Sequence, residues 1–201
     1  RRCSQERELG QLSGLIVRPE VRNLLAGIFG ASPYLTGLIE RDPAGLLRAL
    51  STSPEKRFAT LVDEVAAAMA AADAFPEAMR ILRLFKADIA LLIALCDLAS
   101  VWPLMTVTRH LSEAADVVVS AAVQFLFARA RKGGEWLAPD PAGYMVLAMG
   151  KHGAFELNYS SDIDLIVFYD PARIHLRAGL EVQRFFVRLT RDLVRLLQER
   201  T

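Results

Sequence analysis

The sequence predicts an α+β fold, with a helical bundle over residues 1–138 and a small core of strands and helix over residues 139–201. Two patterns predict this division. Apolar residues recur at helical spacing up to about residue 132, and short continuous apolar runs follow Gly133 and Gly134. Because 53% of the 201 residues are apolar, a disordered chain is excluded. Two cysteines are too few for a disulfide scaffold.

Prolines mark where several of the helices begin. A capping residue followed by proline at the first helical position is a typical helix start. The starts with proline are Ser32-Pro33, Asp42-Pro43, Ser53-Pro54 and Pro76. An earlier apolar stripe ends with Ile28 and Phe29, and a last long helix is expected from about Met105 to Ala130. Successive helices joined by short turns favour a bundle.

Two apolar runs after residue 139 predict β-strands. The first covers residues 144–149 and closes at Gly150, and the second covers residues 162–169. Residues 165–169 are apolar at every position, which predicts a strand buried on both faces of a sheet. Helical spacing returns over residues 180–198. The predicted order is therefore strand, loop, strand, helix.

Asp162 and Asp164 carry the predicted chemistry. Successive side chains of a strand point to opposite faces, so these two carboxylates should emerge on the same side. Neighbouring carboxylates repel each other, and a divalent cation between them offsets that cost. Side-by-side hard oxygens favour Mg²⁺, which takes its other ligands from water and substrate phosphates.

The segment before the aspartates predicts a phosphate-binding turn. Gly150 and Gly153 would let the backbone approach a phosphate closely. Ser160 and Ser161 would supply hydroxyl donors, and Lys151 is a further candidate for contact with phosphate.

An Asp-x-Asp pair also has interpretations that involve no metal. Alone, such a pair is most often a surface pair or a helix cap. An EF-hand is excluded, because residues 165–169 are apolar where that loop needs oxygen ligands. A P-loop is excluded, because Gly150-Lys151 lacks the spaced glycine and Ser/Thr of that motif. The context of strand, glycine turn, serines and second strand favours the metal site.

The stretch GKHGAFELNYSSDIDLIVFYD, which begins at Gly150, resembles the signature of the glutamine synthetase adenylyltransferase family. That family lies within the nucleotidyltransferase superfamily, which has the DNA polymerase β-like fold. Segments upstream resemble the family's helical portion in the same order: residues 32–35, 41–43, 82–86 and 97–99. The resemblance implies a nucleotidyltransferase core over residues 139–201, with Asp162 and Asp164 as catalytic ligands of Mg²⁺. It also implies glutamine synthetase, nucleotide and phosphate as partners.

Asn158 resembles the N-terminal of the two tandem copies in this family, which is the adenylyl-removing copy. The resemblance therefore implies phosphorolysis, in which inorganic phosphate attacks AMP on a tyrosine of glutamine synthetase and ADP leaves. Two alternatives stay open. One is a non-catalytic fragment that docks glutamine synthetase or a PII-type nitrogen-signalling protein. The other is the AMP-adding half, or another nucleotidyltransferase.

The sequence departs from the family pattern at three points. His152 and Ala154 stand where the family usually has leucine and glycine, and His152 is interpreted as a tolerated replacement. The superfamily takes a third carboxylate from a later strand, which the resemblance places after residue 201. We therefore expect an incomplete core, and a chain that is inactive alone.

The net charge, the length of the apolar runs and the cysteines bear on nucleic-acid binding, membrane association and cell compartment. A net charge of +1 gives no reason to expect nucleic-acid binding. The longest apolar run, residues 89–96, is too short to cross a bilayer, so no membrane partner is expected. Cys3 and Cys96 are interpreted as free thiols, which is typical of a reducing compartment. A cytoplasmic protein is the resulting prediction.

Overall fold

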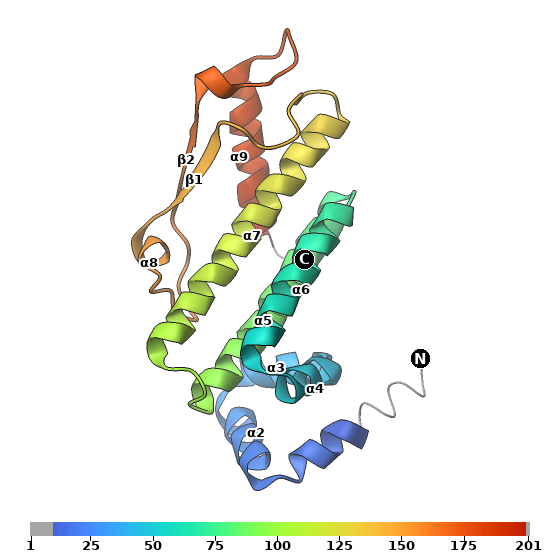
Figure 1. Cartoon of the computed structure of the whole chain (residues 1–201), viewed down its shortest axis with the longest axis vertical. Coiled ribbons are helices and arrows are strands. Elements are labelled where there is room, and N and C mark those ends of the chain that lie inside the picture. The colour runs from blue at the N-terminus through green and yellow to red at the C-terminus, as the bar shows by residue number, and fades with distance from the viewer. Residues whose placement is uncertain (1–9, 200–201) are drawn as a thin grey trace. The chain divides into compact units, whose positions relative to one another are not determined.

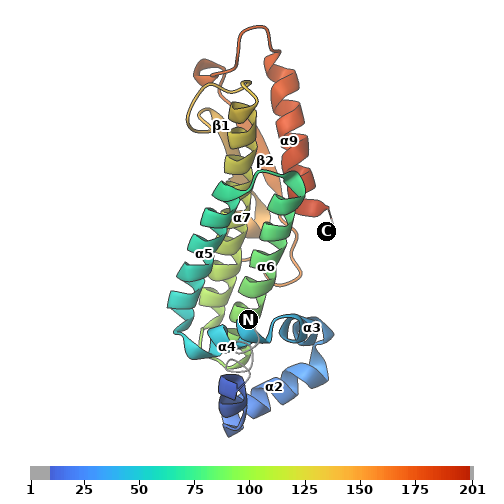
Figure 2. The ribbon, with the colours of Figure 1, turned by 90° about the vertical axis from the view of Figure 1, so that its right-hand side faces the viewer.

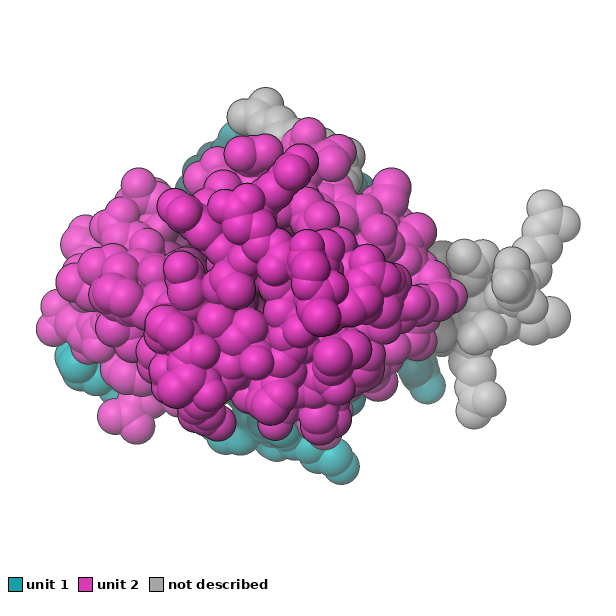
Figure 3. Space-filling view, turned by 90° about the horizontal axis from the view of Figure 1, so that it is seen from above, with its two compact units in different colours: residues 1–61, 86–107 teal, residues 62–85, 108–201 magenta. Residues whose placement is uncertain are grey.

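The computed structural model describes residues 10–199, so Cys3 lies outside the described residues. The fold is α+β, with helices along most of the chain and a small antiparallel sheet near its C-terminal end (Figure 1). Two compact units are each discontinuous in sequence (Figure 3). Unit 1 contains Arg1–Leu61 and Lys86–Val107, and unit 2 contains Val62–Phe85 and Thr108–Thr201. The domain boundary at residue 138 stays a prediction.

Unit 1 is built from short helices and from parts of three long ones. Its elements are a helical segment at residues 10–16, α2 (Pro19–Ala31), α3 (Pro33–Arg41), α4 (Pro43–Ser51), and parts of α5 (Pro54–Ala71), α6 (Phe75–Leu98) and α7 (Leu104–Lys132). Apolar side chains at helical spacing from residues 10–16, α2, α3, α4 and α6 form one core. The buried members of that core are Leu12, Leu25, Ile28, Leu38, Ile39, Leu46, Leu47, Leu91 and Leu95.

Three predicted helix starts are confirmed to the residue. They are the starts of α3, α4 and α5 at Pro33, Pro43 and Pro54. The Oγ of Ser32 accepts a hydrogen bond from the Leu35 N–H at 3.3 Å. The Oγ of Ser53 accepts one from the Lys56 N–H at 3.4 Å. These caps satisfy amide groups that the first turn of a helix leaves without partners.

Unit 2 combines the other parts of α5, α6 and α7 with the sheet and a C-terminal helix (Figure 2). Its further elements are β1 (Tyr144–Ala148), α8 (Gly150–Gly153), β2 (Leu165–Tyr169), η1 (Pro171–Arg173) and α9 (Val182–Gln198). The strands are antiparallel, with Tyr144 opposite Tyr169 and Ala148 opposite Leu165. The predicted order of strand, loop, strand and helix is confirmed, and the one-turn helix α8 was not predicted.

Aromatic side chains hold α9 against the inner face of the sheet. The ring of Tyr169 stacks on Phe186 with centroids 4.5 Å apart. Trp136 is fully buried, and its ring stacks on Phe185 at 5.9 Å. The indole Nε1 of Trp136 donates a hydrogen bond to the Asp140 carbonyl oxygen at 2.8 Å, so the buried ring leaves no polar group unmatched. This packing fixes β2, and with it the segment that carries the aspartates.

The prediction that β2 is buried on both faces is wrong. Its outer face is exposed, together with that of β1, and the four side chains are 41–50% exposed: Met145, Leu147, Ile166 and Phe168. The strand also begins at Leu165 rather than at residue 162. An unbroken apolar run shows that a segment suits a strand, but it does not show which layers cover the sheet.

Helix α7 is long and apolar enough to cross a membrane, judged by its length and composition alone. The core helix of a folded protein passes the same test, and 44% of its most apolar window is buried. Buried residues on α7 within unit 2 include Ala122, Phe125 and Phe127. The sequence predicts this helix, but polar residues interrupt its apolar sequence, so a count of unbroken apolar runs does not identify it as a candidate span.

Candidate functional site

The segment between the strands makes a tight turn at one end of the sheet. The Met149 N–H donates a hydrogen bond to the backbone oxygen of Asp164 at 2.9 Å, which joins the two strand ends. Gly150 has a φ of +55°, which other residues rarely adopt. A side chain at Gly153 would place its Cβ 2.5 Å from the carbonyl oxygen of Ala148. Both positions therefore require glycine for the fold of the turn itself.

The end of α8 is a Schellman motif, a standard way to terminate a helix. The Phe155 N–H donates to the His152 carbonyl oxygen, and the Glu156 N–H donates to the Lys151 carbonyl oxygen. Phe155 has a φ of +59°, at the position where glycine is usual. Ala154, one residue earlier, has an ordinary helical φ of −85°. Alanine at position 154 is therefore compatible with this turn.

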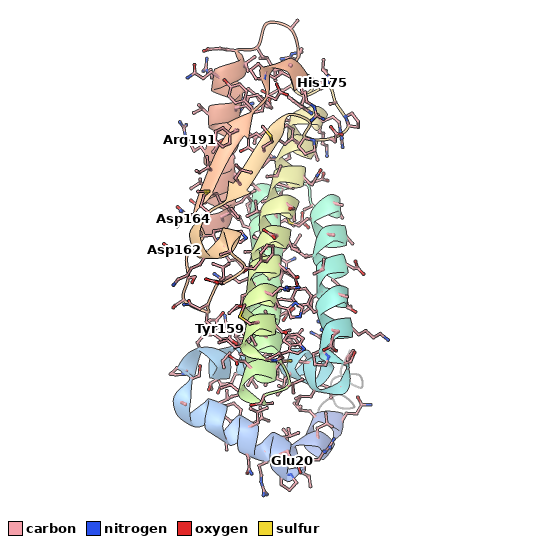
Figure 4. All side chains as sticks on the ribbon, turned by 60° about the vertical axis from the view of Figure 1, so that its left-hand side comes forward. Glu20, Tyr159, Asp162, Asp164, His175 and Arg191 are labelled. Atoms are coloured by element: carbon pink, nitrogen blue, oxygen red, sulfur yellow. The ribbon has the colours of Figure 1, made fainter. Side chains whose placement is uncertain are left out.

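Asp162 and Asp164 lie directly before β2, and both are exposed. Exposure alternates along residues 161–168, so the two carboxylates lie on the same face as Ile166 and Phe168. A Cβ placed on Gly150 would lie 3.7 Å from Oδ2 of Asp164. Figure 4 shows both aspartates at the end of the sheet beside α8. The structure thus brings Asp164 against the glycine turn, with Asp162 beside it in the chain.

Ser160 and Ser161 are engaged with Asn158. Both serine hydroxyls donate to Oδ1 of Asn158, at 3.2 Å for Ser160 and 2.9 Å for Ser161. The Ser160 N–H donates to the same oxygen at 3.1 Å, and the Asn158 N–H donates to Oγ of Ser161 at 3.2 Å. The predicted donation of these hydroxyls to phosphate therefore requires the bonds to Asn158 to open.

Lys151 and His152 point to different environments although they are adjacent. Lys151 is exposed, and His152 is buried with its Nε2 2.9 Å from Oδ1 of Asp116. Further along the turn, the buried Leu157 donates its N–H to Oγ of Ser112 at 3.4 Å. Ser112 and Asp116 are not among the residues predicted from the sequence to belong to the site. The sequence does contain one sign of them. Ser112 and Asp116 are polar residues four apart in a helix whose neighbouring positions are mostly apolar, and this spacing places them on one face of α7.

The donors at the turn fit magnesium. Within residues 10–199, no group of three or more His, Cys, Asp and Glu side chains forms a candidate metal site. Magnesium is commonly held by one or two carboxylates, with water and substrate phosphates as its remaining ligands. Asp162 and Asp164 supply two hard oxygen donors on an exposed face, which is sufficient for that kind of site.

A groove of about 610 Å³ lies in another part of unit 2, between α5 and α7. Met69 and Ala66 line it from α5, and Ala121 and Gln124 line it from α7. Asp116 also lines this groove, whereas Asp162 and Asp164 do not. The carboxylates are therefore surface groups beside the turn, outside this groove.

Comparison with known proteins gives consistent matches. The family model for glutamate-ammonia ligase adenylyltransferase matches residues 22–201. A protein of Bradyrhizobium diazoefficiens is 47% identical over 95% of the chain, and one of Rhodopseudomonas palustris is 47% identical over 90%. One of Xanthobacter autotrophicus is 44% identical over 96%. All three are named bifunctional glutamine synthetase adenylyltransferase/adenylyl-removing enzyme.

The chain spans about a fifth of the length of these relatives, since the matched region covers 19–20% of each of them.

Proposed function

The chain belongs to the glutamate-ammonia ligase adenylyltransferase family, and on that premise we propose that it takes part in removing AMP from glutamine synthetase. One observation carries the proposal: two exposed carboxylates, Asp162 and Asp164, beside a turn whose backbone requires glycine. Residues 139–201 would be the first part of a nucleotidyltransferase core, to which, by the family resemblance, a later strand would add a third carboxylate. Adenylyl transfer and adenylyl removal, with glutamine synthetase as the protein concerned, are the activities stated in the names of the relatives.

The proposed reaction is a phosphorolysis. An oxygen of inorganic phosphate bonds to the phosphorus of AMP, and the bond from that phosphorus to the tyrosine oxygen breaks. The tyrosine oxygen takes up a proton, so the products are ADP and unmodified glutamine synthetase. The exposed Lys151 would bind a phosphate oxygen, because its ammonium group can donate hydrogen bonds and balance negative charge.

Asp162 and Asp164 would hold Mg²⁺, which when bound neutralises charge on phosphoryl oxygens. The contribution of the chain is to place both carboxylates on one exposed face and to keep Asp164 against the glycine turn. The hydrogen bond from Met149 to the backbone of Asp164 maintains that placement. A phosphate bound at the turn would thus lie close to the carboxylates.

Asn158 supports assignment to the adenylyl-removing half. Its side-chain oxygen accepts three hydrogen bonds, from the hydroxyls of Ser160 and Ser161 and from the Ser160 N–H. By the family resemblance, the AMP-adding copy usually has glycine at this position. Glycine has no side chain to accept these bonds, so the turn before the aspartates would be organised differently in that copy.

The test is Asp162→Asn in the full-length protein that carries this sequence. We expect AMP removal to fall by about 100-fold or more, because the variant loses one of two charged metal ligands. Asp170→Asn is the matched control, because Asp170 follows the other end of β2 and caps η1 through the Ala172 N–H. Undiminished AMP removal by Asp162→Asn at saturating Mg²⁺ would refute the site.

A docking role is the second candidate, and one observation favours it. Within the described residues the turn gathers two carboxylates and no third metal-binding side chain. In that case the chain would bind glutamine synthetase, or a PII-type signalling protein, without binding Mg²⁺ and nucleotide. Calorimetry on this chain separates the two roles. Binding to glutamine synthetase without binding of Mg²⁺ and nucleotide would favour docking, and the opposite pattern would count against it. The AMP-adding half is distinguished by assaying AMP transfer and AMP removal separately on the full-length protein.

The proposed location is the cytoplasm, where the chain would have access to glutamine synthetase. The buried, unbridged Cys96 is compatible with a reducing compartment.

A further inference from the structure

His152 is a buried polar side chain that nothing in the proposed chemistry uses. It is 3% exposed, and its Nδ1 is buried without a hydrogen-bond partner. Its Nε2 lies 2.9 Å from Oδ1 of Asp116, whose side chain is half-exposed. Pairing with a carboxylate places a ring hydrogen on Nε2, so this nitrogen donates to Asp116. The ring is almost wholly buried and Nδ1 has no access to solvent, so this arrangement fits a packed side chain paired with Asp116 rather than a catalytic base.

The partner residues on α7 form a second, related contact with the same turn. Ser112 is fully buried, and its Oγ accepts a hydrogen bond from the Leu157 N–H while donating to the Thr108 carbonyl oxygen at 3.0 Å. Ser112 and Asp116 are one helical turn apart, so they lie on the same face of α7. The turn is therefore hydrogen-bonded to α7 at two residues, His152 within α8 and Leu157 after it.

From these contacts we infer that Asp116 is a positioning residue, which acts through His152 to hold the glycine turn in register with Asp162 and Asp164. The inference rests on the proposed function of that turn. His152 is the middle of α8, between Lys151 and Gly153, so a shift of its ring moves the whole one-turn helix. Gly150, at the start of the same helix, is the residue that lies against Asp164.

The sequence at position 152 makes this arrangement specific. A leucine at this position would fill a similar space without needing a polar partner. A buried histidine that loses its partner has no hydrogen bond at Nε2. The free energy of unfolding then falls by more than the hydrogen bond contributes when it is made. The role of Asp116 should therefore depend on the presence of His152.

The experiment is a double-mutant cycle of Asp116→Ala and His152→Leu in the full-length protein. We expect Asp116→Ala to raise the KM for inorganic phosphate about tenfold, with a smaller change in kcat, because the phosphate-binding turn is displaced. In the His152→Leu background the same change should alter that KM less than about twofold. Asp116→Asn keeps an oxygen acceptor for Nε2 and should restore most of the phosphate affinity.

Glu113→Ala is the matched control. Glu113 accepts from Nδ1 of His110 at 2.8 Å, so it forms a histidine–carboxylate pair on the same helix. This partner lies within α7, so the hydrogen bond of Glu113 goes to His110 and not to the turn. A purely structural role would lower the thermal midpoint of Asp116→Ala and leave the KM for phosphate unchanged well below that midpoint. That result, or equal effects of Asp116→Ala in both backgrounds, would overturn the inference.

Hydrogen–deuterium exchange on this chain separates failure of the inference from failure of the proposed function. Asp116→Ala should speed exchange over residues 150–157, and Glu113→Ala should not. If the wild-type protein removes no AMP, the proposed function fails, and exchange alone decides whether Asp116 holds the turn. Unchanged exchange over residues 150–157 would refute the contact whatever the activity.

Discussion

Phe155 occupies a left-handed backbone conformation, with φ at +59°, because it terminates α8 at the glycine position of a Schellman motif. That conformation costs a non-glycine residue roughly 1–2 kcal/mol. Its side chain is exposed, so it recovers little by packing. We expect Phe155→Gly to raise the free energy of unfolding by about 0.5–1 kcal/mol, measured by urea denaturation.

The neighbouring Ala154 provides the control for this prediction. Its φ of −85° suits any L-residue, so Ala154→Gly gains no relief and adds flexibility to the unfolded chain. We expect that variant to be less stable than the wild type. A loss of stability in Phe155→Gly as well would show that the phenyl ring contributes packing that offsets the backbone cost.

Cys96 is buried in unit 1, and burial raises the pKa of its thiol to about 11, with a smaller contribution from the carboxylate of Glu55. In the unfolded chain the thiol ionises near its ordinary value of 9.0. Between pH 9 and pH 11 the thiol is therefore largely deprotonated in the unfolded chain and largely protonated in the folded protein. The stability linked to this thiol is therefore present below pH 9 and is lost as the pH rises toward 11.

For Cys96 we expect a loss of up to about 3 kcal/mol across that range, from about two pKa units at 1.36 kcal/mol each. The measurement is urea denaturation at several pH values in a Cys3→Ser background, with alkylation by iodoacetamide as a second readout. Cys96→Ala should show a smaller loss over the same range. Rapid alkylation of the folded protein at pH 8 would contradict the raised pKa.

At the scale of elements, two helix starts look alike in sequence and differ in structure. Ser32 and Asp42 each precede a proline at the first helical position. Ser32 caps α3 through the Leu35 N–H, whereas the carboxylate of Asp42 bonds Arg48 at 2.8 Å and makes no cap bond. We expect Ser32→Ala to cost about 1 kcal/mol of stability.

Asp42→Ala should cost less than about 0.5 kcal/mol, because its ion pair with Arg48 is nearly half-exposed and such pairs contribute little. Thermal and urea denaturation of both variants compare the two starts directly. Equal losses would show that the ion pair of Asp42 stabilises α4 as much as the cap of Ser32 stabilises α3.

These elements also show what sequence can predict. The starts at Pro33 and Pro54 depend on residues within one turn, so local pattern was sufficient. The shared face of Asp162 and Asp164 follows from the alternation of an extended chain, and it persists although both precede β2. The contact between Asp116 and His152 joins residues 36 apart in the chain, and no local pattern indicates it.

At the scale of the whole molecule, the outer face of the sheet is an exposed apolar surface among the described residues. The register pairs Met145 with Phe168 and Leu147 with Ile166, so four large apolar side chains form one exposed patch. The described sheet has two strands, and each therefore has an edge with unpaired backbone groups. Exposed apolar faces and open edges both promote association between chains.

The net charge of +1 provides little repulsion to oppose such association. We therefore expect this 201-residue chain to self-associate reversibly, with a sedimentation coefficient that rises with concentration. The variant Leu147→Glu with Ile166→Lys places opposite charges at directly facing positions, which removes the apolar face and retains a favourable cross-strand pair. It should sediment as a monomer at all concentrations tested.

Phe29→Glu, at an exposed aromatic residue of α2, is the control and should still associate. A wild-type sedimentation coefficient independent of concentration, or an equal effect of Phe29→Glu, would rule out the sheet face as the cause.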